Sequence, residues 1–301
     1  MTTVKNHRIG LVGKGIASSL SPVLHETEAR ALGLARYRYE LLDIDVAASM
    51  NGLRRSPAEA AAVVREAVAD GFTGFNITHP CKQTVIDGLD ELDPHAAALG
   101  AVNTVVVTGD GRLIGHNTDY SGFLTAFRGG LPGAALDLVV LCGAGGAGSA
   151  VAHALATAGT GRLIIADADP ARAISLADHV GRAHPGTEAT GIAAADMVPH
   201  VSRADGVVNA SPIGMEGFAG TPFDTAGLHA RLWVADIVYR PVCTQLLGTA
   251  ATLGCHTLDG ARMLVAQAAD TFALVTGVEP DRHRMRHHLH DVLRRRAALA
   301  S

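Results

Sequence analysis

The chain has 301 residues, 48% of them hydrophobic and 18% charged, so it can form one large domain or two ordinary ones with a substantial core. Its formal net charge of −4 gives no basic surplus for nucleic-acid binding, and no apolar run approaches the roughly 20 residues of a membrane span. Met1–Arg8 lacks a secretory apolar stretch, and the four scattered cysteines lack metal-binding spacing. We therefore expect a cytoplasmic protein with reduced thiols and no metal.

The N-terminal part of the chain alternates predicted strands and helices. A short strand at 9–13 precedes a helix with Ser21 as N-cap and Pro22 at N1, which stops at Gly33. Strands separated by helices indicate an α/β fold with a mostly parallel sheet and helices on both faces. The other predicted elements are strands at 37–44, 74–78, 101–108 and 113–115, the last two forming a hairpin, and helices at 57–70, 82–90 and 121–128.

A second βα series begins with an apolar strand at 138–142 that enters a glycine-rich turn. A helix-compatible stretch follows, and the next apolar run ends at Asp167. This order is typical of a Rossmann unit, in which a dinucleotide pyrophosphate lies on a helix N-terminus and the acid binds the adenosine ribose 2′-hydroxyl. An acid repels a 2′-phosphate, which favours NAD over NADP. The turn consists of Gly143, Ala144, Gly145, Gly146 and Ala147.

Further strands are predicted at 206–210, 232–237 and 256–258, followed by a helical tail from Gly260. The tail is too long to belong obviously to the second α/β unit. It could fold back on the first unit, which would make the N-terminal domain discontinuous.

Four polar clusters come just past predicted strand ends, where open α/β sheets bind their ligands. They offer hydroxyls, amides, one ammonium and one carboxylate, which suit a small polyhydroxylated acid and proton transfer. Simpler interpretations exist: Ser19 and Ser21 could cap a helix, Asn103 could stabilise a turn, Asp119 could cap a helix and Lys82 could be a solvated surface residue. The clusters lie at 18–21, 76–82, 101–104 and 116–119.

Seven motifs in this order resemble the shikimate dehydrogenase family across nearly the whole chain. The resemblance implies a substrate domain of residues 1–120 with 260–301 and a Rossmann domain of residues 121–259. The motifs are Ser-Leu-Ser-Pro-Val-Leu-His (19–25), Phe-Asn-Ile-Thr-His-Pro-Cys-Lys-Gln (75–83), Gly-Ala-Val-Asn-Thr (100–104), His-Asn-Thr-Asp (116–119), Asn-Ala-Ser-Pro-Ile-Gly-Met (209–215), Asp-Ile-Val-Tyr-Arg-Pro (236–241) and Leu-Asp-Gly-Ala-Arg-Met-Leu-Val-Ala-Gln-Ala (258–268).

The resemblance also implies roles for individual residues. Lys82 and Asp119 would form the catalytic pair, and Ser19 and Ser21 would hold the substrate carboxylate. The residues expected near ring hydroxyls or the substrate are Thr78, Asn103, Gln267 and Tyr239. Those expected to border the cofactor, besides the glycine-rich turn, are Asp167, Arg172, Ser211 and Gly260.

The expected reaction moves a hydride from substrate C3 to nicotinamide while a protein base takes the hydroxyl proton. A free lysine has a pKa of about 10.4 and is a poor base at neutral pH, so Lys82 would need that pKa lowered by burial, whereas a neighbouring Asp119 would raise it. Which member carries the proton stays open, and the pair is best treated as one coupled unit.

The stretch after the second nucleotide-domain strand departs from the pattern of NADP-dependent members. Family members that use NADP carry an arginine there, whereas this chain has Asp167-Ala168-Asp169, with Arg172 nearby. The sequence therefore resembles the NAD-dependent quinate/shikimate branch. Quinate-preferring relatives often have Thr at the position of Ser21, so we expect shikimate to be accepted and quinate to be a second substrate, because one methyl group changes selectivity by about 1–3 kcal/mol.

Two alternatives remain open at this point. One is an aminoshikimate-type dehydrogenase of a secondary pathway. The other is a non-catalytic NAD or metabolite sensor, which would be expected to have lost Lys82 or Asp119. The basic segment 282–296 is interpreted as a solvated amphipathic helix that closes the substrate domain, and the assembly as a monomer or homodimer.

Overall fold

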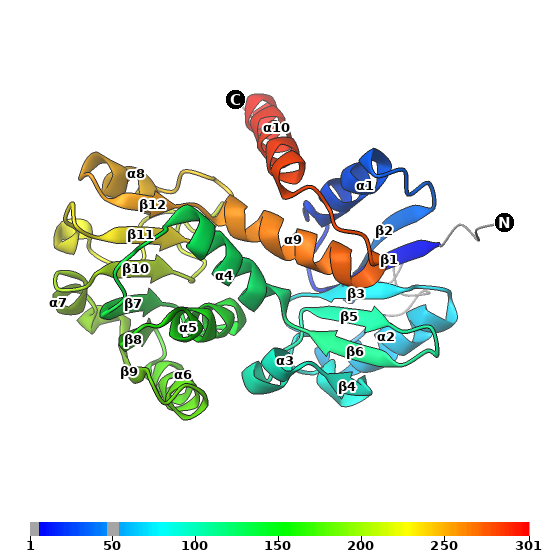
Figure 1. The fold of residues 1–301 in the computed structure, drawn as a ribbon, viewed down its shortest axis with the longest axis horizontal. Coiled ribbons are helices and arrows are strands. Elements are labelled where there is room, and N and C mark those ends of the chain that lie inside the picture. The colour runs from blue at the N-terminus through cyan, green and yellow to red at the C-terminus, as the bar shows by residue number, and fades with distance from the viewer. Residues whose placement is uncertain (1–5, 47–53, 301) are drawn as a thin grey trace. The chain divides into compact units, whose positions relative to one another are not determined.

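The computed structural model describes residues 6–46 and 54–300, and the chain divides into two compact units. The first unit comprises Met1–Thr118 and Gln267–Ser301, and the second comprises Asp119–Ala266. Each unit contains a six-stranded sheet (Figure 1). The expected α/β class with two domains is confirmed.

The sheet of the first unit is mixed, with strand order β2-β1-β3-β5-β6-β4. β1 pairs in parallel with β2 and β3, whereas the predicted hairpin of β5 and β6 adds antiparallel pairs. The two-residue edge strand β4 was not predicted. The strands are β1 (His7–Gly13), β2 (Tyr37–Asp43), β3 (Gly74–Ile77), β4 (Glu91–Leu92), β5 (Thr104–Val107) and β6 (Leu113–His116).

Alternation along β1 divides the core of this unit between the two faces of the sheet. Ile9 and Leu11 pack in a cluster with Phe272, whereas Val12 packs in a second cluster with Val63 and Phe75. The first cluster brings helices α1 and α9 to one face, and the second brings α2 to the other. The helices are α1 (Ser21–Ala31), α2 (Ala60–Ala69), α3 (Pro94–Leu99), α9 (Gly260–Thr276) and α10 (Arg282–Ala300), with 3-10 turns at Pro57–Glu59 and Ile86–Gly88.

The last helix, α10, packs against α1 (Figure 1). Met285 and Leu289, one turn apart, are its buried contacts, at 1% and 0% exposure. Glu28 of α1 is also buried, and it accepts hydrogen bonds from the Arg284 guanidinium and from the backbone N–H of Asp281 at 2.7 Å. An ion pair with a buried carboxylate and two apolar side chains therefore hold the C-terminal helix on the first unit.

The predicted helix at 82–90 is wrong, because the structure has only short turns and the 3-10 turn Ile86–Gly88 there. The Thr84 hydroxyl donates to the carbonyls of Cys81 and Pro57, at 3.3 and 2.6 Å, and such side-chain bonds compete with helical ones. Gly88 also lies so close to α2 that a Cβ there would be 2.4 Å from the Ala61 Cβ. Packing on α2 therefore overrides the local helical preference.

The sheet of the second unit is entirely parallel, with strand order β12-β11-β10-β7-β8-β9. The strands are β7 (Leu138–Cys142), β8 (Arg162–Asp167), β9 (Glu188–Ala193), β10 (Gly206–Asn209), β11 (Trp233–Asp236) and β12 (His256–Leu258). The helices are α4 (Thr118–Gly130), α5 (Gly146–Ala158), α6 (Pro170–Ala183), α7 (Val198–Val201) and α8 (Gln245–Thr252), with 3-10 turns at Ala194–Asp196 and Thr225–Gly227.

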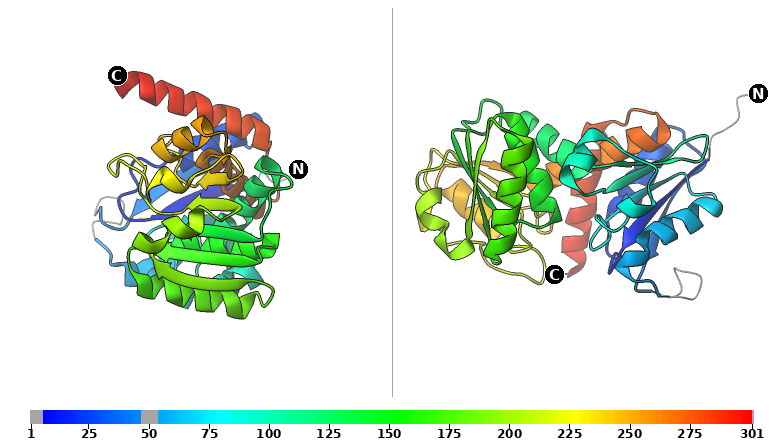
Figure 2. Two further views of the ribbon diagram at one scale, coloured as in Figure 1. Left: turned by 90° about the vertical axis from the view of Figure 1, so that its left-hand side faces the viewer. Right: turned by 90° about the horizontal axis from the view of Figure 1, so that it is seen from below.

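The central strand β7 is buried along its whole length, and its side chains alternate between the two faces of the sheet. Edge strand β9 was not predicted, because its sequence is only half-buried and lacks an apolar run. Helix α6 lies against β8 and β9 (Figure 2). Gly191 permits this packing, since a Cβ there would lie 2.3 Å from the backbone N of Ile174 in α6.

Candidate active site

The predicted polar clusters lie along one edge of the first unit's sheet. β1 and β3 run in parallel, and the hairpin returns so that Thr104 pairs with both Asn76 and His116. The segments after β1, β3 and β6 and the segment before β5 therefore share this edge. They carry the predicted residues Ser19, Ser21, Thr78, Lys82, Asn103 and Asp119.

Helix α1 does not use Ser21 as its N-cap. The helix begins with Ser21 itself, and Leu20 occupies the N-cap position without a side-chain bond, so this expectation is wrong. The Ser19 Oγ instead accepts the backbone N–H of Ser21 at 3.2 Å. The Ser21 hydroxyl is hydrogen-bonded to the buried Tyr39 hydroxyl, and burial raises the pKa of that phenol above its usual range. Ser21 is therefore not needed to cap the helix.

Lys82 and Thr78 follow β3 in a segment fixed by backbone bonds. The N–H of Thr78 donates to the carbonyl of Val12 at 2.9 Å, and the carbonyl of Lys82 accepts the N–H of Val102 at 2.8 Å. Both side chains are half-buried. The second bond joins the backbone of Lys82 to Val102, the residue that directly precedes Asn103.

Asn103 is buried, and its amide orientation follows from its partners. The Oδ1 accepts the backbone N–H of Thr118 at 2.6 Å, and a backbone N–H can only donate, so the atom facing it is the oxygen. The hydroxyls of Thr104 and Thr118 also lie 3.1 Å from this oxygen. Because the oxygen is used inside the fold, the amide NH₂ is the part of Asn103 suited to donate to a ligand.

The same network joins the start of helix α4 and the interior of helix α9 to the sheet. The Thr271 hydroxyl lies 3.0 and 3.1 Å from those of Thr104 and Thr118, and the Asn76 Nδ2 donates to it at 3.1 Å. Gln267 precedes Thr271 by one turn of α9 and therefore projects from the same side of the helix.

Asp119 is the second residue of α4 and is 6% exposed. The residue before the helix is Asn117, so the interpretation of Asp119 as an N-cap is wrong. The preceding Thr118 is fixed to Asn103, which places the start of α4 at the sheet edge that carries the predicted polar clusters.

The glycine-rich turn after β7 has the shape that a pyrophosphate requires. Gly143 has φ +105, and a Cβ there would lie 2.8 Å from the backbone of Ala210. A Cβ on Gly148 would lie 1.9 Å from the Gly143 carbonyl oxygen. Gly145 occupies the N-cap of α5 without a side chain, so the helix N-terminus is open to an anion. The turn therefore fits a dinucleotide.

Asp167 ends β8 beside this turn. Its Oδ2 accepts the N–H of Ala144 at 2.7 Å, and its Oδ1 accepts the N–H of Asp169 at 2.9 Å. The exposed Arg172 of α6 reaches the same turn, since its guanidinium lies 3.5 Å from where a Cβ of Gly145 would stand. The turn thus has both a carboxylate and a guanidinium at its rim.

The other predicted residues of the second unit follow its neighbouring strands. Ser211 comes after β10, and Tyr239 comes after β11 in a half-buried position. Gly260 begins α9, and a Cβ there would lie 2.3 Å from the Ile237 carbonyl oxygen. Ser211, Tyr239 and Gly260 thus all adjoin the carboxyl ends of parallel strands, where such sheets bind ligands.

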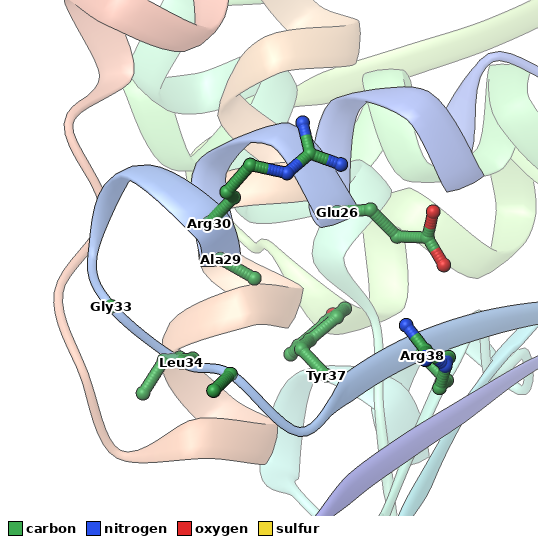
Figure 3. Close-up of a pocket in the computed structure, with 8 residues that line it drawn as sticks. Glu26, Ala29, Arg30, Gly33, Leu34, Tyr37 and Arg38 are labelled. Atoms are coloured by element: carbon green, nitrogen blue, oxygen red, sulfur yellow. The ribbon is translucent and has the colours of Figure 1, made fainter.

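A cavity of about 260 Å³ opens elsewhere in the first unit, between α1 and β2 (Figure 3). Glu26, Arg30, Tyr37 and Arg38 line it, and the Arg30 guanidinium points away from the Tyr37 ring. None of the predicted site residues lines this cavity, so it is separate from the candidate site.

The described residues form neither a membrane-spanning helix nor a metal-binding cluster. In residues 6–46 and 54–300, no helix combines the length and the apolar character needed to cross a bilayer. In the same part of the chain, no three histidine, cysteine or acidic side chains converge as metal ligands would. The four cysteines are free thiols.

Thr271 was missed in the sequence, as was its contact with Asn76 of the predicted polar cluster 76–82. Asn76 and Thr271 are 195 residues apart, and nothing local to either residue indicates that they meet. Asp236 could have been found from the sequence, because a carboxylate at the end of an apolar strand indicates a polar site at that strand end. It is buried at 1% exposure and bonded to both Asn209 and Thr244.

Comparison with known proteins identifies relatives over nearly the whole chain. Residues 11–105 match the family model for the shikimate dehydrogenase substrate binding domain. A shikimate dehydrogenase (NADP(+)) of Streptomyces avermitilis is 52% identical over 94% of this chain and 94% of its own length. A quinate/shikimate dehydrogenase (NAD(+)) of Corynebacterium efficiens is 48% identical over 92% of this chain and 95% of its own.

Solved structures show the same fold. Quinate dehydrogenase from Corynebacterium glutamicum in complex with NAD superposes with a TM-score of 0.88 at 44% identity, covering 95% of this chain and 99% of that one. The curated relatives thus include both NAD- and NADP-named enzymes, and the fold similarity extends over both units.

Proposed function

Because this chain belongs to the shikimate dehydrogenase family of oxidoreductases, we propose that it interconverts shikimate and 3-dehydroshikimate, and also quinate and 3-dehydroquinate, with NAD as the favoured cofactor. Residues 1–120 with 260–301 would bind the acid, and residues 121–259 would bind the dinucleotide. The observation that carries the proposal is the single sheet edge of the first unit, where Lys82, Asn103 and the start of α4 are linked by backbone and amide hydrogen bonds.

The acid would be held by donors spaced along this edge. Ser19 lies just before α1 and Ser21 is its first residue, and both hydroxyls would donate to the carboxylate. The Asn103 amide, fixed by Thr118, would donate to a ring hydroxyl, as would Thr78 and Gln267 from neighbouring segments. Fixed donors of this kind reject analogues that lack the hydroxyl, because the donor would be left unpaired.

Lys82 and Asp119 would act as one acid–base pair. The C3 hydroxyl would lose its proton to this pair as the C3 hydride leaves, and the carbonyl forms without further co-reactants. Bound NAD supplies the hydride acceptor. We expect Lys82→Met and Asp119→Asn each to lower kcat about 10²- to 10⁴-fold with smaller changes in KM. Steady-state rates with shikimate would measure this, and a kcat within threefold of wild type in either variant would contradict it.

Asp167 supports the preference for NAD, since its carboxylate at the rim of the glycine-rich turn would repel a 2′-phosphate. Arg172 at the same rim supports residual use of NADP. We expect kcat/KM to be higher for NAD, and Arg172→Gln to lower kcat/KM for NADP about tenfold while sparing NAD, as for loss of one charge-assisted bond. Arg182→Gln, on the same helix, is the matched control. A wild-type preference for NADP would contradict the assignment.

The first experiment is oxidation of shikimate and of quinate by the purified protein with each cofactor. Turnover of either acid with NAD supports the proposal, and the ratio of the two kcat/KM values measures the effect of Ser21. Failure of both acids with both cofactors would overturn the substrate assignment.

A further inference from the structure

The carboxylate of Asp236 lies at the carboxyl end of β11 with 1% of the residue exposed. Among the described residues it has no ion-pair partner, and its bonds come from three neutral donors. Its Oδ1 accepts Asn209 Nδ2 and the N–H of Val238, both at 3.0 Å, and its Oδ2 accepts the Thr244 hydroxyl at 2.8 Å. Burial raises the pKa of this carboxyl to about 6, because burial disfavours its charged form.

One of these donors shapes the loop after β10. Asn209 donates to Asp236 and also to the carbonyl of Ile213 at 2.9 Å. Its Oδ1 accepts both the N–H and the hydroxyl of Ser211, at 3.0 and 2.7 Å. The conformation around Ser211 therefore depends on Asn209, whose amide is oriented by Asp236.

The other two donors shape the loop after β11. Val238 directly precedes Tyr239, so its bond to Asp236 sets the direction of the chain at Tyr239. Thr244 caps α8 by accepting the N–H of Leu247 at 3.2 Å while its hydroxyl proton goes to Asp236. One carboxylate thus fixes both ends of the segment that carries Tyr239.

The two loops are also tied to each other. The N–H of Glu216 donates to the carbonyl of Arg240 at 3.0 Å, and the side chains of these two residues form an ion pair at 2.5 Å. A change at the Asp236 carboxylate, which is bonded to both loops, would therefore move the two loops together.

We propose that Asp236 is a positioning residue for the reaction. It holds the loop after β10, which carries Ser211, and the loop after β11, which carries Tyr239, in the arrangement that binds cofactor and substrate. This inference rests on the proposed roles of Ser211 and Tyr239. The site calls for a carboxylate because three donors converge on it, and a carboxylate is an acceptor at both oxygens. An amide would turn one of those oxygens into a donor and disturb either Asn209 or Thr244.

The test compares Asp236→Asn with Asp205→Asn. Asp205 lies before β10, at the opposite end of that strand, and its Oδ2 accepts the N–H of Leu138 at 2.8 Å. The two substitutions are chemically the same, and each replaces a carboxylate that accepts a backbone N–H. Only the carboxylate of Asp236 is bonded to the two loops. We expect Asp236→Asn to weaken NADH binding about tenfold, measured by fluorescence, and to lower kcat/KM for the acid by more than tenfold. Asp205→Asn is expected to leave both quantities within twofold of wild type.

Two Thr244 variants keep the inference testable if Asp236→Asn fails to fold. Thr244→Val removes one of the three donors and is expected to reproduce the binding defect in milder form, about threefold. Thr244→Ser keeps the hydroxyl and is expected to behave as wild type. A purely structural role would lower the unfolding midpoint of both the Asp236 and Thr244→Val variants without moving the dissociation constant of NADH.

A pH series separates positioning from general destabilisation. We expect wild-type NADH binding to weaken below about pH 6, where Asp236 becomes protonated, and the Asp236→Asn variant to lack this change. The titratable group facing Asp236 is the thiol of Cys142 on β7, whose pKa burial raises to about 11, so it stays neutral throughout. NADH dissociation constants within twofold of wild type in both Asp236→Asn and Thr244→Val would overturn the inference. Because NADH binding is measured without the acid, a failed substrate assignment would leave this test intact.

Discussion

His25 is a fully buried side chain that titrates far from its usual range. Its Nδ1 lies 2.8 Å from the Tyr37 hydroxyl. The centroid of its ring lies 4.8 Å from the ring centroid of Tyr39 and 6.1 Å from that of Phe272. Burial lowers the pKa of this imidazole to about 3. The folded protein therefore keeps His25 neutral at a pH where the unfolded chain binds a proton.

This shift predicts acid sensitivity of the first unit. The stability that neutral His25 contributes is complete above pH 6.5 and is lost as the pH falls from there toward 3, because protons then bind the unfolded chain. Between pH 7.5 and 5 the free energy of unfolding should fall by about 2 kcal/mol through this group. Urea unfolding of wild type and His25→Asn at both pH values would measure the difference. An equal pH dependence in the two proteins would contradict it.

At the scale of elements, the β7–α5 junction depends on the absence of a side chain at Gly148. A Cβ there would lie 1.9 Å from the Gly143 carbonyl oxygen, which is backbone and cannot move aside without breaking the turn. Gly181 of α6 offers a matched control, because its Cβ would meet nothing within 4 Å.

We expect Gly148→Ala to destabilise the protein by more than 2 kcal/mol, as for other overpacked or strained sites, and to abolish NADH binding. Gly181→Ala should stabilise it by about 0.5–1 kcal/mol, since alanine favours helix interiors. Urea unfolding and NADH fluorescence would report both effects. Normal NADH affinity in Gly148→Ala would show that the turn tolerates a side chain and does not cradle the phosphates closely.

The attachment of α10 to α1 depends on one buried carboxylate. Glu28 has a side-chain exposure of 1%, against 40% for its partner Arg284. By contrast, Arg294 and Asp291 form a pair within α10 in which the arginine is 78% exposed. The two arginines thus permit a comparison on a single helix.

Removing Arg284 should cost far more than removing Arg294. Arg284→Met would leave the buried Glu28 carboxyl without its cation and should lower the midpoint of urea unfolding, whereas Arg294→Met removes an exposed pair and should leave the midpoint unchanged. Chemical unfolding would measure both, and adding Glu28→Gln to Arg284→Met should restore part of the loss. Similar effects of the two arginine variants would refute this account of the α10 attachment.

At the scale of the whole molecule, each unit has its own sheet and core, so ligands that bind different units should protect different amides. We expect NADH to slow hydrogen exchange mainly in residues 138–259, and shikimate to slow it mainly in residues 6–118 and 267–300. A ligand at 100 times its dissociation constant stabilises the folded state by about 2.7 kcal/mol. Exchange measured by mass spectrometry with each ligand alone would test the division. Protection of the second unit by shikimate alone would contradict the assignment of the acid to the first.

Much of this protein could be predicted from contiguous residues. The glycine-rich turn and Asp167 lie within one βα unit, and the hairpin flanking Gly109–Gly111 depends on neighbouring residues, so both were predicted correctly as structure. The failures have other causes. The 3-10 turn at Ile86–Gly88 forms in place of the predicted helix because Gly88 packs on α2. Strand β9 forms because it pairs with β8 and packs against α6.

The sequence by itself determined the α/β class, the dinucleotide-binding turn and the identity of the polar clusters, because each depends on residue types and spacing within a short segment. Only the tertiary structure decided that Asn76, Asn103, Thr118 and Thr271 form one network, and that Asp236 joins two loops. The physical reason is that a buried polar group must find its partners wherever the packed core places them, and neither composition nor local spacing specifies contacts across 195 residues.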